Sequence, residues 1–280
     1  MKKLTVFTIV VILTVFLAGC ISAPGGTRGG IGVVIKEFKV EPTAIEARDD
    51  QRVFLSLTIQ NNGGAMATNI KTNFIVGSDF VPPSGSIDNI PSSLPPANPA
   101  LGIREGGVGH GTKEIIYRGG QKTNTLSYPI LLRLSYDYST VIDGIVKIVT
   151  PEYFRQTKET GGILQFSQSE GPIQAQLAVP VSVIGHGSEI RVHLRLRDVG
   201  GGRSYVGDIN AGLGLVRISS SGCIFPTSTV FIPQGGETVA TCTIQPLAAG
   251  ELFTTKSFKI TIDYSYFIDL HSSITVLPTS

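Results

Sequence analysis

The sequence predicts an all-β fold made of two consecutive β-sandwich domains behind an N-terminal export segment. One block occurs twice, at 136–143 and 262–269, with Asp, Tyr, Ser, Ile and Asp recurring in register 126 positions apart. Apolar and polar residues alternate in short runs that Gly, Pro and Asn interrupt, which is typical of strands. After residue 20 no apolar pattern follows the period of about 3.6 residues that marks a helix. We therefore expect very little helix, and we interpret the duplicated block as a strand, a turn and a strand in each domain.

The first residues have the pattern of an export signal. Lys2 and Lys3 precede an apolar run from 4 to 18, which is shorter than the roughly 20 residues that span a membrane. The run ends in Leu17-Ala18-Gly19-Cys20, which resembles the lipobox of bacterial and archaeal lipoproteins. That resemblance implies removal of the signal peptide 1–19 and attachment of lipid to Cys20. An uncleaved helix, or an ordinary secretory signal with an incidental cysteine, is the alternative.

A lipid on Cys20 would place the protein outside the cytoplasm, on the outer face of the cell membrane. Two aliphatic chains hold a protein to a bilayer firmly, whereas one does so only marginally. The Gly-rich stretch within 20–32 is then a flexible spacer between the bilayer and the folded body.

The charge balance excludes some partners. Without Lys2 and Lys3, the 23 basic residues fall to 21, which equals the 21 acidic residues. A net charge near zero with no basic run argues against nucleic acid and against an anionic membrane surface. A protein or glycan of the cell envelope remains the expected partner.

Three pairs of blocks recur in the same order, and their offsets are 139, 129 and 126. They are 52–55 with 191–194, 103–107 with 232–236, and 137–143 with 263–269. The shrinking offset places extra residues in the first copy, in the Pro- and Gly-rich insertion 77–111. That segment is too rich in proline for a central strand, so we expect a long surface excursion with an edge strand.

The duplication defines two domains, 33–150 and 172–280. A polar linker, 151–171, joins them, and we expect its apolar residues Ile163, Leu164 and Phe166 to pack at the domain junction. Predicted strands include 34–40, 53–59, 69–76, 191–196 and 208–216. The side chains expected to face the cores are Leu55, Leu57, Ile59, Leu132, Leu134, Leu194, Leu196, Ile260 and Ile262.

Two further cysteines, Cys223 and Cys242, lie in the second copy. Paired cysteines in an exported protein predict a structural disulfide. Zinc binding and redox catalysis are disfavoured, because the sequence has no Cys-x-x-Cys and no further Cys or His at ligand spacing.

The order of turn and strand motifs resembles a known family. An alternating strand, Asn61-Asn62-Gly63-Gly64 and then Asn69-Ile70 come first, and Gly235-Gly236-Glu237-Thr238 comes later. This pattern is similar to the CARDB-type immunoglobulin-like modules common in archaeal surface and secreted proteins. The resemblance implies two tandem immunoglobulin-like sandwiches and an adhesion or scaffolding role. The second copy departs from the pattern, with Asp198-Val199-Gly200 in place of the Asn pair.

Candidate ligand-binding residues are few. The repeated carboxylates Asp137/Asp143 and Asp263/Asp269 would cap a hairpin turn, or alternatively contribute to a Ca²⁺ site. The residues Arg191, Arg195 and Arg197 alternate with apolar ones and should project from one sheet face. That face is either plain solvated surface or an interaction surface for carboxylate-bearing glycans or an acidic protein. The four histidines, His110, His186, His193 and His271, form no pair at metal-ligand spacing and are expected on loops or the surface.

No nucleophile motif, phosphate loop or dinucleotide fingerprint is present, so we predict a protein that is not an enzyme and needs no cofactor. The predicted function is that of a membrane-anchored extracytoplasmic lipoprotein with a structural, adhesion or scaffolding role. The alternative is a module that binds a glycan or an envelope component, as an accessory to a surface complex.

Overall fold

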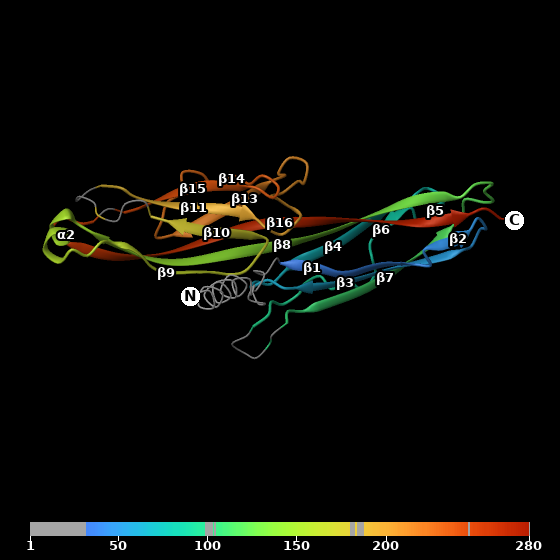
Figure 1. The fold of residues 1–280 in the computed structure, drawn as a ribbon, viewed down its shortest axis with the longest axis horizontal. Coiled ribbons are helices and arrows are strands. Elements are labelled where there is room, and N and C mark those ends of the chain that lie inside the picture. Colours follow the sequence, from blue (N-terminus) through green and yellow to red (C-terminus); the bar gives the residue numbers. More distant parts are fainter. Residues whose placement is uncertain are drawn as a thin grey trace, which may run out of the picture.

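The protein is an elongated, nearly all-β molecule, with 61% of its residues in strands and 3% in helix. The computed structural model describes residues 32–98, 103, 105–179, 183, 188–245 and 247–279. Helix α2 lies at one end of the long axis, and strand β2 and the C-terminus lie at the other (Figure 1).

The strands of the first half are β1 (Val33–Glu41), β2 (Ala44–Glu46), β3 (Arg52–Asn61), β4 (Thr68–Ile75), β5 (Phe80–Val81), β6 (Ser84–Gly85) and β7 (Val108–Tyr117). The elements of the second half are α2 (Pro151–Thr157), β9 (Gly162–Gln168), β10 (Ile173–Ala178), β11 (Ile190–Asp198), β12 (Arg203–Tyr205), β13 (Leu215–Ser221), β14 (Thr229–Phe231) and β15 (Glu237–Ile244). Two strands, β8 (Leu126–Val149) and β16 (Phe253–Leu277), run through both halves.

Strands β8 and β16 form the centre of the molecule. They are 24 and 25 residues long and pair antiparallel along almost their whole length. Tyr138 lies opposite Tyr264, its own counterpart in the duplicated block, so the two copies are related by a local pseudo-two-fold axis at this pair. We call the middle of this strand pair, residues 135–140 of β8 and 262–267 of β16, the waist.

The predicted turn in the duplicated block is therefore wrong. Both copies continue straight through the block as strand, because it is built of aromatic and β-branched residues that favour extended backbone. The aspartates also have partners across the strand pair: Ser139 donates to Asp263, and Ser265 donates to Asp137 over 2.5 Å. Asp137, Asp263 and Asp269 thus bond to the other copy, and all four aspartates lie within strands and not at a turn.

Each half is an immunoglobulin-like sandwich of two sheets whose strands pair antiparallel, except that the short strand β2 pairs parallel with β16. In the first half, the order β1-β3-β7 faces β4-β8-β16; in the second, β10-β11-β15 faces β13-β16-β8. These orders match the A-B-E and C-F-G sheets of an immunoglobulin domain, in which F and G are ordinarily neighbours in sequence. Here the F strand of each half continues directly into the other half as its G strand. The two sandwiches thus exchange their last strands within one chain, as in a domain swap.

The predicted core residues are confirmed. All of them are fully buried: Leu55, Leu57, Ile59, Leu132, Leu134, Leu194, Leu196, Ile260 and Ile262. The even-numbered residues of β8 are buried from Ile130 to Ile148, so both smaller sheets cover the same face of the β8–β16 pair.

The segment between the repeats differs from the expected polar linker. It contains helix α2 and strand β9, and β9 pairs with β8 at the edge of the large sheet. Ile163, Leu164 and Phe166 do not pack at a domain junction, because they lie on this edge strand and are 39%, 60% and 37% exposed. The two halves are joined instead by the shared strands β8 and β16.

Two further expectations change in detail. The predicted strand at 208–216 is a turn up to Gly214, and β13 begins at Leu215. The insertion 77–111 does supply edge strands, since β5 pairs with β7 and β6 with β4. It is nevertheless more than a surface excursion, because Phe80, Ile87 and Leu94 are buried in the core.

The predicted disulfide between Cys223 and Cys242 is confirmed, with a Cα–Cα distance of 5.7 Å. Both cysteines are buried. They link the segment that follows β13 to β15, which lies in the opposite sheet of the second sandwich.

Replacing both cysteines by alanine is expected to lower the free energy of unfolding by about 3 kcal/mol, because the bridge closes a loop of about 18 residues in the unfolded chain. Urea denaturation of the oxidised protein and of the variant measures this difference. An unchanged midpoint and slope would contradict it.

Candidate functional site

The outer face of the β8–β16 pair at the waist carries a row of polar side chains. Odd-numbered residues of both strands point away from the two smaller sheets, among them Ser135, Asp137, Ser139, Asp263 and Ser265. These side chains are partly exposed, and the loops that flank β12 and β4 border them.

The duplicated aspartates stand opposite basic residues. Asp269 lies across from Arg133, and its counterpart Asp143 lies across from Lys259, which is the counterpart of Arg133. Only the first of these pairs forms an ion pair among the described residues. Arg133 donates from Nε and Nη2 to the two carboxylate oxygens of Asp269, each over 2.7 Å. These hydrogen bonds raise the pKa of Arg133 further above its ordinary value.

Two cavities open on this face. The first, the axial cavity, has a volume of about 280 Å³ and lies on the pseudo-two-fold axis. Asp137 and Asp263 line it together with Met66, Tyr205 and Arg217. Asn69 also donates to Asp137, over 2.6 Å, so this carboxylate is held from two sides.

The second cavity, which we call the arginine cavity, has a volume of about 510 Å³. Its lining includes Arg133, Arg203, Asn210, Gln234, Phe267 and Asp269. The guanidinium carbon of Arg133 lies 4.3 Å from the centre of the Phe267 ring, and the centres of the Tyr205 and Phe267 rings are 6.1 Å apart. The lining therefore contains two guanidinium groups and one carboxylate.

The inner face of the waist is a tyrosine cluster. Tyr138 accepts from the amide of Ala65 over 3.0 Å and donates to the carbonyl of Glu170 over 2.9 Å. Tyr266 donates to Asp198 over 2.7 Å. Burial raises the pKa of Tyr138 to about 12 and that of Tyr266 further. These phenols stay protonated and serve as hydrogen-bond donors that fasten loops of both halves to the shared strands.

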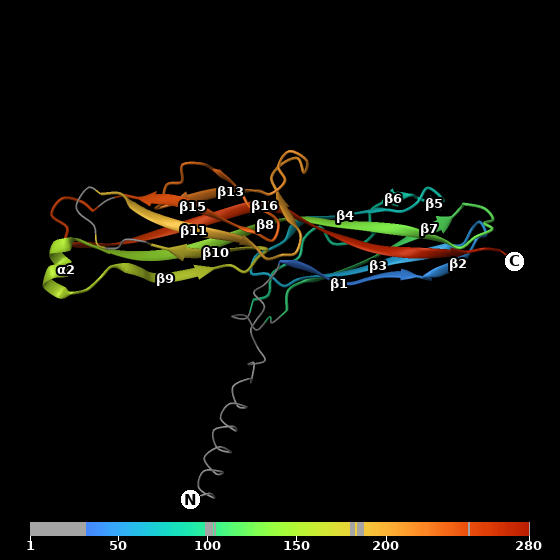
Figure 2. The ribbon, with the colours of Figure 1, turned by 45° about the horizontal axis from the view of Figure 1, so that its top comes forward.

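The first described residue, Gly32, lies on this inner face of the waist. Gly32 accepts from the amide of Asn62 over 2.8 Å, and a Cβ at Gly32 would lie 3.0 Å from the hydroxyl of Tyr136. Strand β1 thus begins near the middle of the long axis, as Figure 2 shows. The two cavities lie on the opposite face of the β8–β16 pair.

The predicted arginine surface lies on the outer face of β11. Arg191, Arg195 and Arg197 are exposed. Arg191 contacts Glu189 at 3.5 Å and Arg195 contacts Glu237 at 3.9 Å, so neighbouring carboxylates partly neutralise this surface. The arrangement agrees with the prediction that the three side chains share a face, while their role in binding stays a prediction.

The histidines that the structure describes lie on strands. His110 is on β7, where it is exposed at the surface as expected, and it is hydrogen-bonded to Thr58 at 3.1 Å. His193 is hydrogen-bonded to Thr241 at 2.8 Å across the strand pair, and His271 is exposed on β16. His186 lies outside the described residues. Within the described part of the chain, no three His, Cys, Asp or Glu side chains gather as a metal site.

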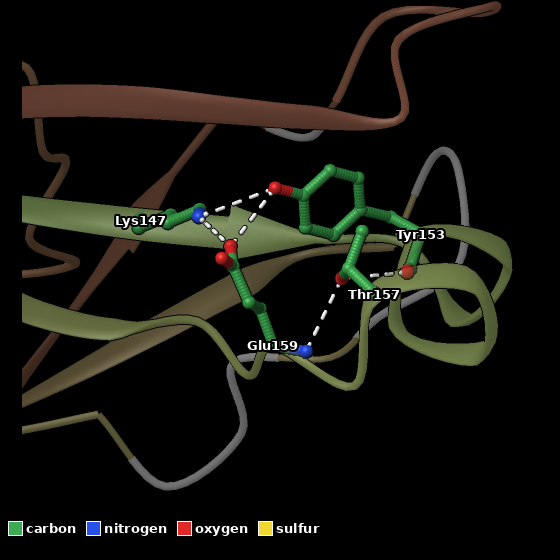
Figure 3. Close-up of polar contacts among 4 residues, drawn as sticks. All are labelled: Lys147, Tyr153, Thr157 and Glu159. Atoms are coloured by element: carbon green, nitrogen blue, oxygen red, sulfur yellow. Dashed lines mark hydrogen bonds and ion pairs between the residues drawn. The ribbon is translucent and has the colours of Figure 1, made fainter.

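A polar cluster closes the end of the molecule at α2 (Figure 3). Lys147 of β8 contacts Glu159 at 2.7 Å, and the hydroxyl of Tyr153 donates to the same carboxylate over 2.9 Å. The hydrogen bond from Lys147 lowers the pKa of Glu159, and the reverse contact raises that of Lys147. Thr157 accepts from the amide of Glu159 over 3.1 Å. The cluster fixes the short helix and the start of β9 against β8, which is a structural role.

Cys20 and the signal segment lie outside the described residues. Among the residues that the structure does describe, no helix is both long and apolar enough to cross a membrane.

Sequence reasoning missed the arginine cavity. Its residues come from positions 133, 201–213, 234 and 267–269, which only the exchanged strands bring together. One signal was visible in the repeat, since Arg133 and Lys259 occupy equivalent positions and so do Asp269 and Asp143. The charge pair could therefore be predicted from the sequence. The contact of Arg133 with Phe267, and the loop residues 201–213 that line the cavity, could not.

The fold and these surfaces define an all-β protein of two immunoglobulin-like sandwiches that share two strands and carry two cavities at the waist. No family model matches the chain, and no curated protein does. Among solved structures, the D0-D1 domain of intimin is 10% identical over 87% of this chain and 98% of that one, with a TM-score of 0.20. The adhesin InvE of Yersinia pseudotuberculosis is 10% identical over 90% of this chain and 61% of that one, with a TM-score of 0.19. The alpha-2-macroglobulin of E. coli is 11% identical over 88% of this chain and 17% of that one, with a TM-score of 0.23. Similarities at this level assign no function.

Proposed function

We propose that this chain is an extracytoplasmic lipoprotein that is held to the outer face of the cell membrane through Cys20 and acts as a structural, adhesion or scaffolding subunit. It is not an enzyme in this proposal, and its partner is a protein or glycan of the cell envelope. The CARDB-type resemblance of the turn motifs supports the same class of surface protein.

One observation carries the proposal: β8 and β16 pair through both sandwiches without a break. A hinge between two tandem domains would let them move independently, since relative motion is the default for linked domains. Two continuous strands remove that freedom and make a single extended body. Such a body suits a spacer or scaffold that must hold partners at a fixed separation.

The place where the chain enters supports a specific arrangement. The described residues begin at Gly32, which lies at the waist, and the proposed spacer would join the folded body there. Residues 20–31 would reach at most about 40 Å when fully extended, at roughly 3.3–3.6 Å per residue. We infer that the tether holds the molecule by its middle, so that both ends extend sideways along the cell surface and the waist cavities face away from the membrane.

Replacing Cys20 by serine is expected to move the protein from the membrane fraction to the soluble extracytoplasmic fraction. The reason is that a lipidated Cys20 is the proposed membrane anchor. Cell fractionation followed by detergent phase partition measures this, with Ser22→Ala as the control that keeps the cysteine. A Cys20→Ser protein that stays in the membrane fraction would overturn the lipid anchor.

Cross-linking in the native cells, followed by mass spectrometry, tests the scaffold role. Recovery of one defined envelope complex, cross-linked through residues of the sandwiches, is the expected result. Recovery of the anchored monomer alone would contradict it.

A further inference from the structure

We propose that the arginine cavity binds a sugar that carries a carboxylate, such as a hexuronic acid unit of an envelope polysaccharide. This inference goes beyond the scaffold role and does not depend on Cys20. Its failure would leave the fractionation result untouched.

The charge of the cavity selects an anion. Arg133 and Arg203 bring two positive charges, and Asp269 brings one negative charge, which leaves one positive charge in excess. Arg133 uses two of its five N–H groups on Asp269, and Arg203 uses its Nε on Gln234 over 2.6 Å. Among the described residues, the other N–H groups of both side chains have no protein acceptor. Arginine forks of this kind match the geometry of a carboxylate.

The position of Arg133 is fixed before a ligand arrives. The double hydrogen bond to Asp269 and the contact with the Phe267 ring hold the guanidinium in one orientation. Because a preorganised group loses little conformational entropy on binding, Arg133 can position an anion without rearranging.

The remaining lining suits a sugar ring more than a bare anion. The amides of Asn210 and Gln234 can donate to and accept from hydroxyl groups. Ile209 and Leu213 supply apolar contacts of the kind that the C–H face of a sugar makes. A volume of about 510 Å³ lies within the range of roughly 300–1,000 Å³ typical of small-molecule sites.

The pseudo-symmetry provides an internal comparison. At the equivalent place in the other half, Lys259 stands opposite Asp143, and Val141 takes the position of Phe267. That place therefore lacks both the guanidinium and the aromatic ring. The two duplicated positions therefore differ, and only the one in the arginine cavity carries the residues that suit a carboxylate-bearing sugar.

Isothermal titration of the full chain in detergent with glucuronate, galacturonate, glucose and inorganic phosphate tests the proposal. Both uronates are expected to bind at least about tenfold more tightly than glucose, because a hydrogen bond to a charged group is worth about one order of magnitude in affinity. Phosphate is expected to bind more weakly than the uronates, since it lacks the ring and the hydroxyl groups.

Two variants are matched with two controls. Arg203→Gln and Asn210→Ala are expected to weaken uronate binding, the first by at least about tenfold, with no loss of thermal stability, because both side chains lie at the surface of the cavity. Lys259→Gln at the symmetry-related place, and Arg48→Gln, an exposed residue just after β2 at the far end of the molecule, should leave binding unchanged. Equal binding of glucose or phosphate, no uronate binding at tens of millimolar, or unchanged binding by Arg203→Gln would overturn the proposal.

Discussion

A fragment of residues 33–137, which ends at the waist, is expected to remain unfolded, although it contains all but one of the strands of the first sandwich. The missing G strand is the second part of β16, and its side chains Ile274 and Val276 are fully buried in the core of the first half. Burial of one such side chain contributes about 1.5–3 kcal/mol, and the strand also satisfies the whole exposed edge of β8. Together these losses are comparable with the roughly 5–15 kcal/mol that stabilises a typical domain.

Adding the missing strand back to the fragment tests whether its absence is the cause. Joining residues 265–279 to the fragment through a flexible Gly/Ser loop is expected to restore a cooperatively folded sandwich, because it closes the F and G strands into the ordinary hairpin. Calorimetry and amide NMR dispersion distinguish the two chains. Cooperative unfolding of the fragment without the added strand would show that the exchange of strands is dispensable.

The same exchange predicts one unfolding unit for the whole protein. Each half uses a strand that the other half anchors, so neither sandwich can open without disturbing its partner. A single calorimetric transition is therefore the natural consequence of the continuous β8 and β16, whereas two independent domains would show two.

The repeat itself could be read from the sequence, and so could the faces of the strands. The alternation of apolar and polar residues around Leu55 and Leu134 predicts that both are buried, because every second residue of a half-buried strand points inward. The exchange of strands could not be predicted, since the block around Tyr138 serves equally as a hairpin or as a continuous strand. Its outcome depends on contacts with Asp263 and Ser265, which lie more than 120 positions away.

The departure of the second copy from the turn motif has a simple explanation in the structure. Asn61 and Asp198 end equivalent strands, and the side-chain Oδ1 of each accepts from the amide two positions on, that of Gly63 over 3.0 Å and that of Gly200 over 3.2 Å. Both are Asx turns, which either residue type can form. The sequence difference therefore preserves the local geometry.

These two positions should respond differently to substitution. Asn61→Leu is expected to lower the free energy of unfolding by about 4 kcal/mol or more. Asn61 is fully buried, and its amide also donates to the carbonyls of Ala65 over 2.8 Å and Leu94 over 3.0 Å. Leucine has a similar size but leaves the amide of Gly63 and the carbonyl of Ala65 without this partner, at about 1–3 kcal/mol each, and it removes one of the two hydrogen bonds to the carbonyl of Leu94.

Asp198→Asn is the matched control, and its effect should be small and depend on pH. Burial raises the pKa of Asp198 above its ordinary value, so the folded state binds this proton more tightly than the unfolded state. The wild type therefore loses stability as the pH rises from about 3.8 through the raised pKa, and the asparagine variant does not. Urea denaturation at pH 3 and at pH 7 should show the variant gaining relative to the wild type at the higher pH. If Asp198→Asn proved as destabilising as Asn61→Leu at both pH values, the carboxylate charge would be needed in place, and the two Asx turns would not be equivalent.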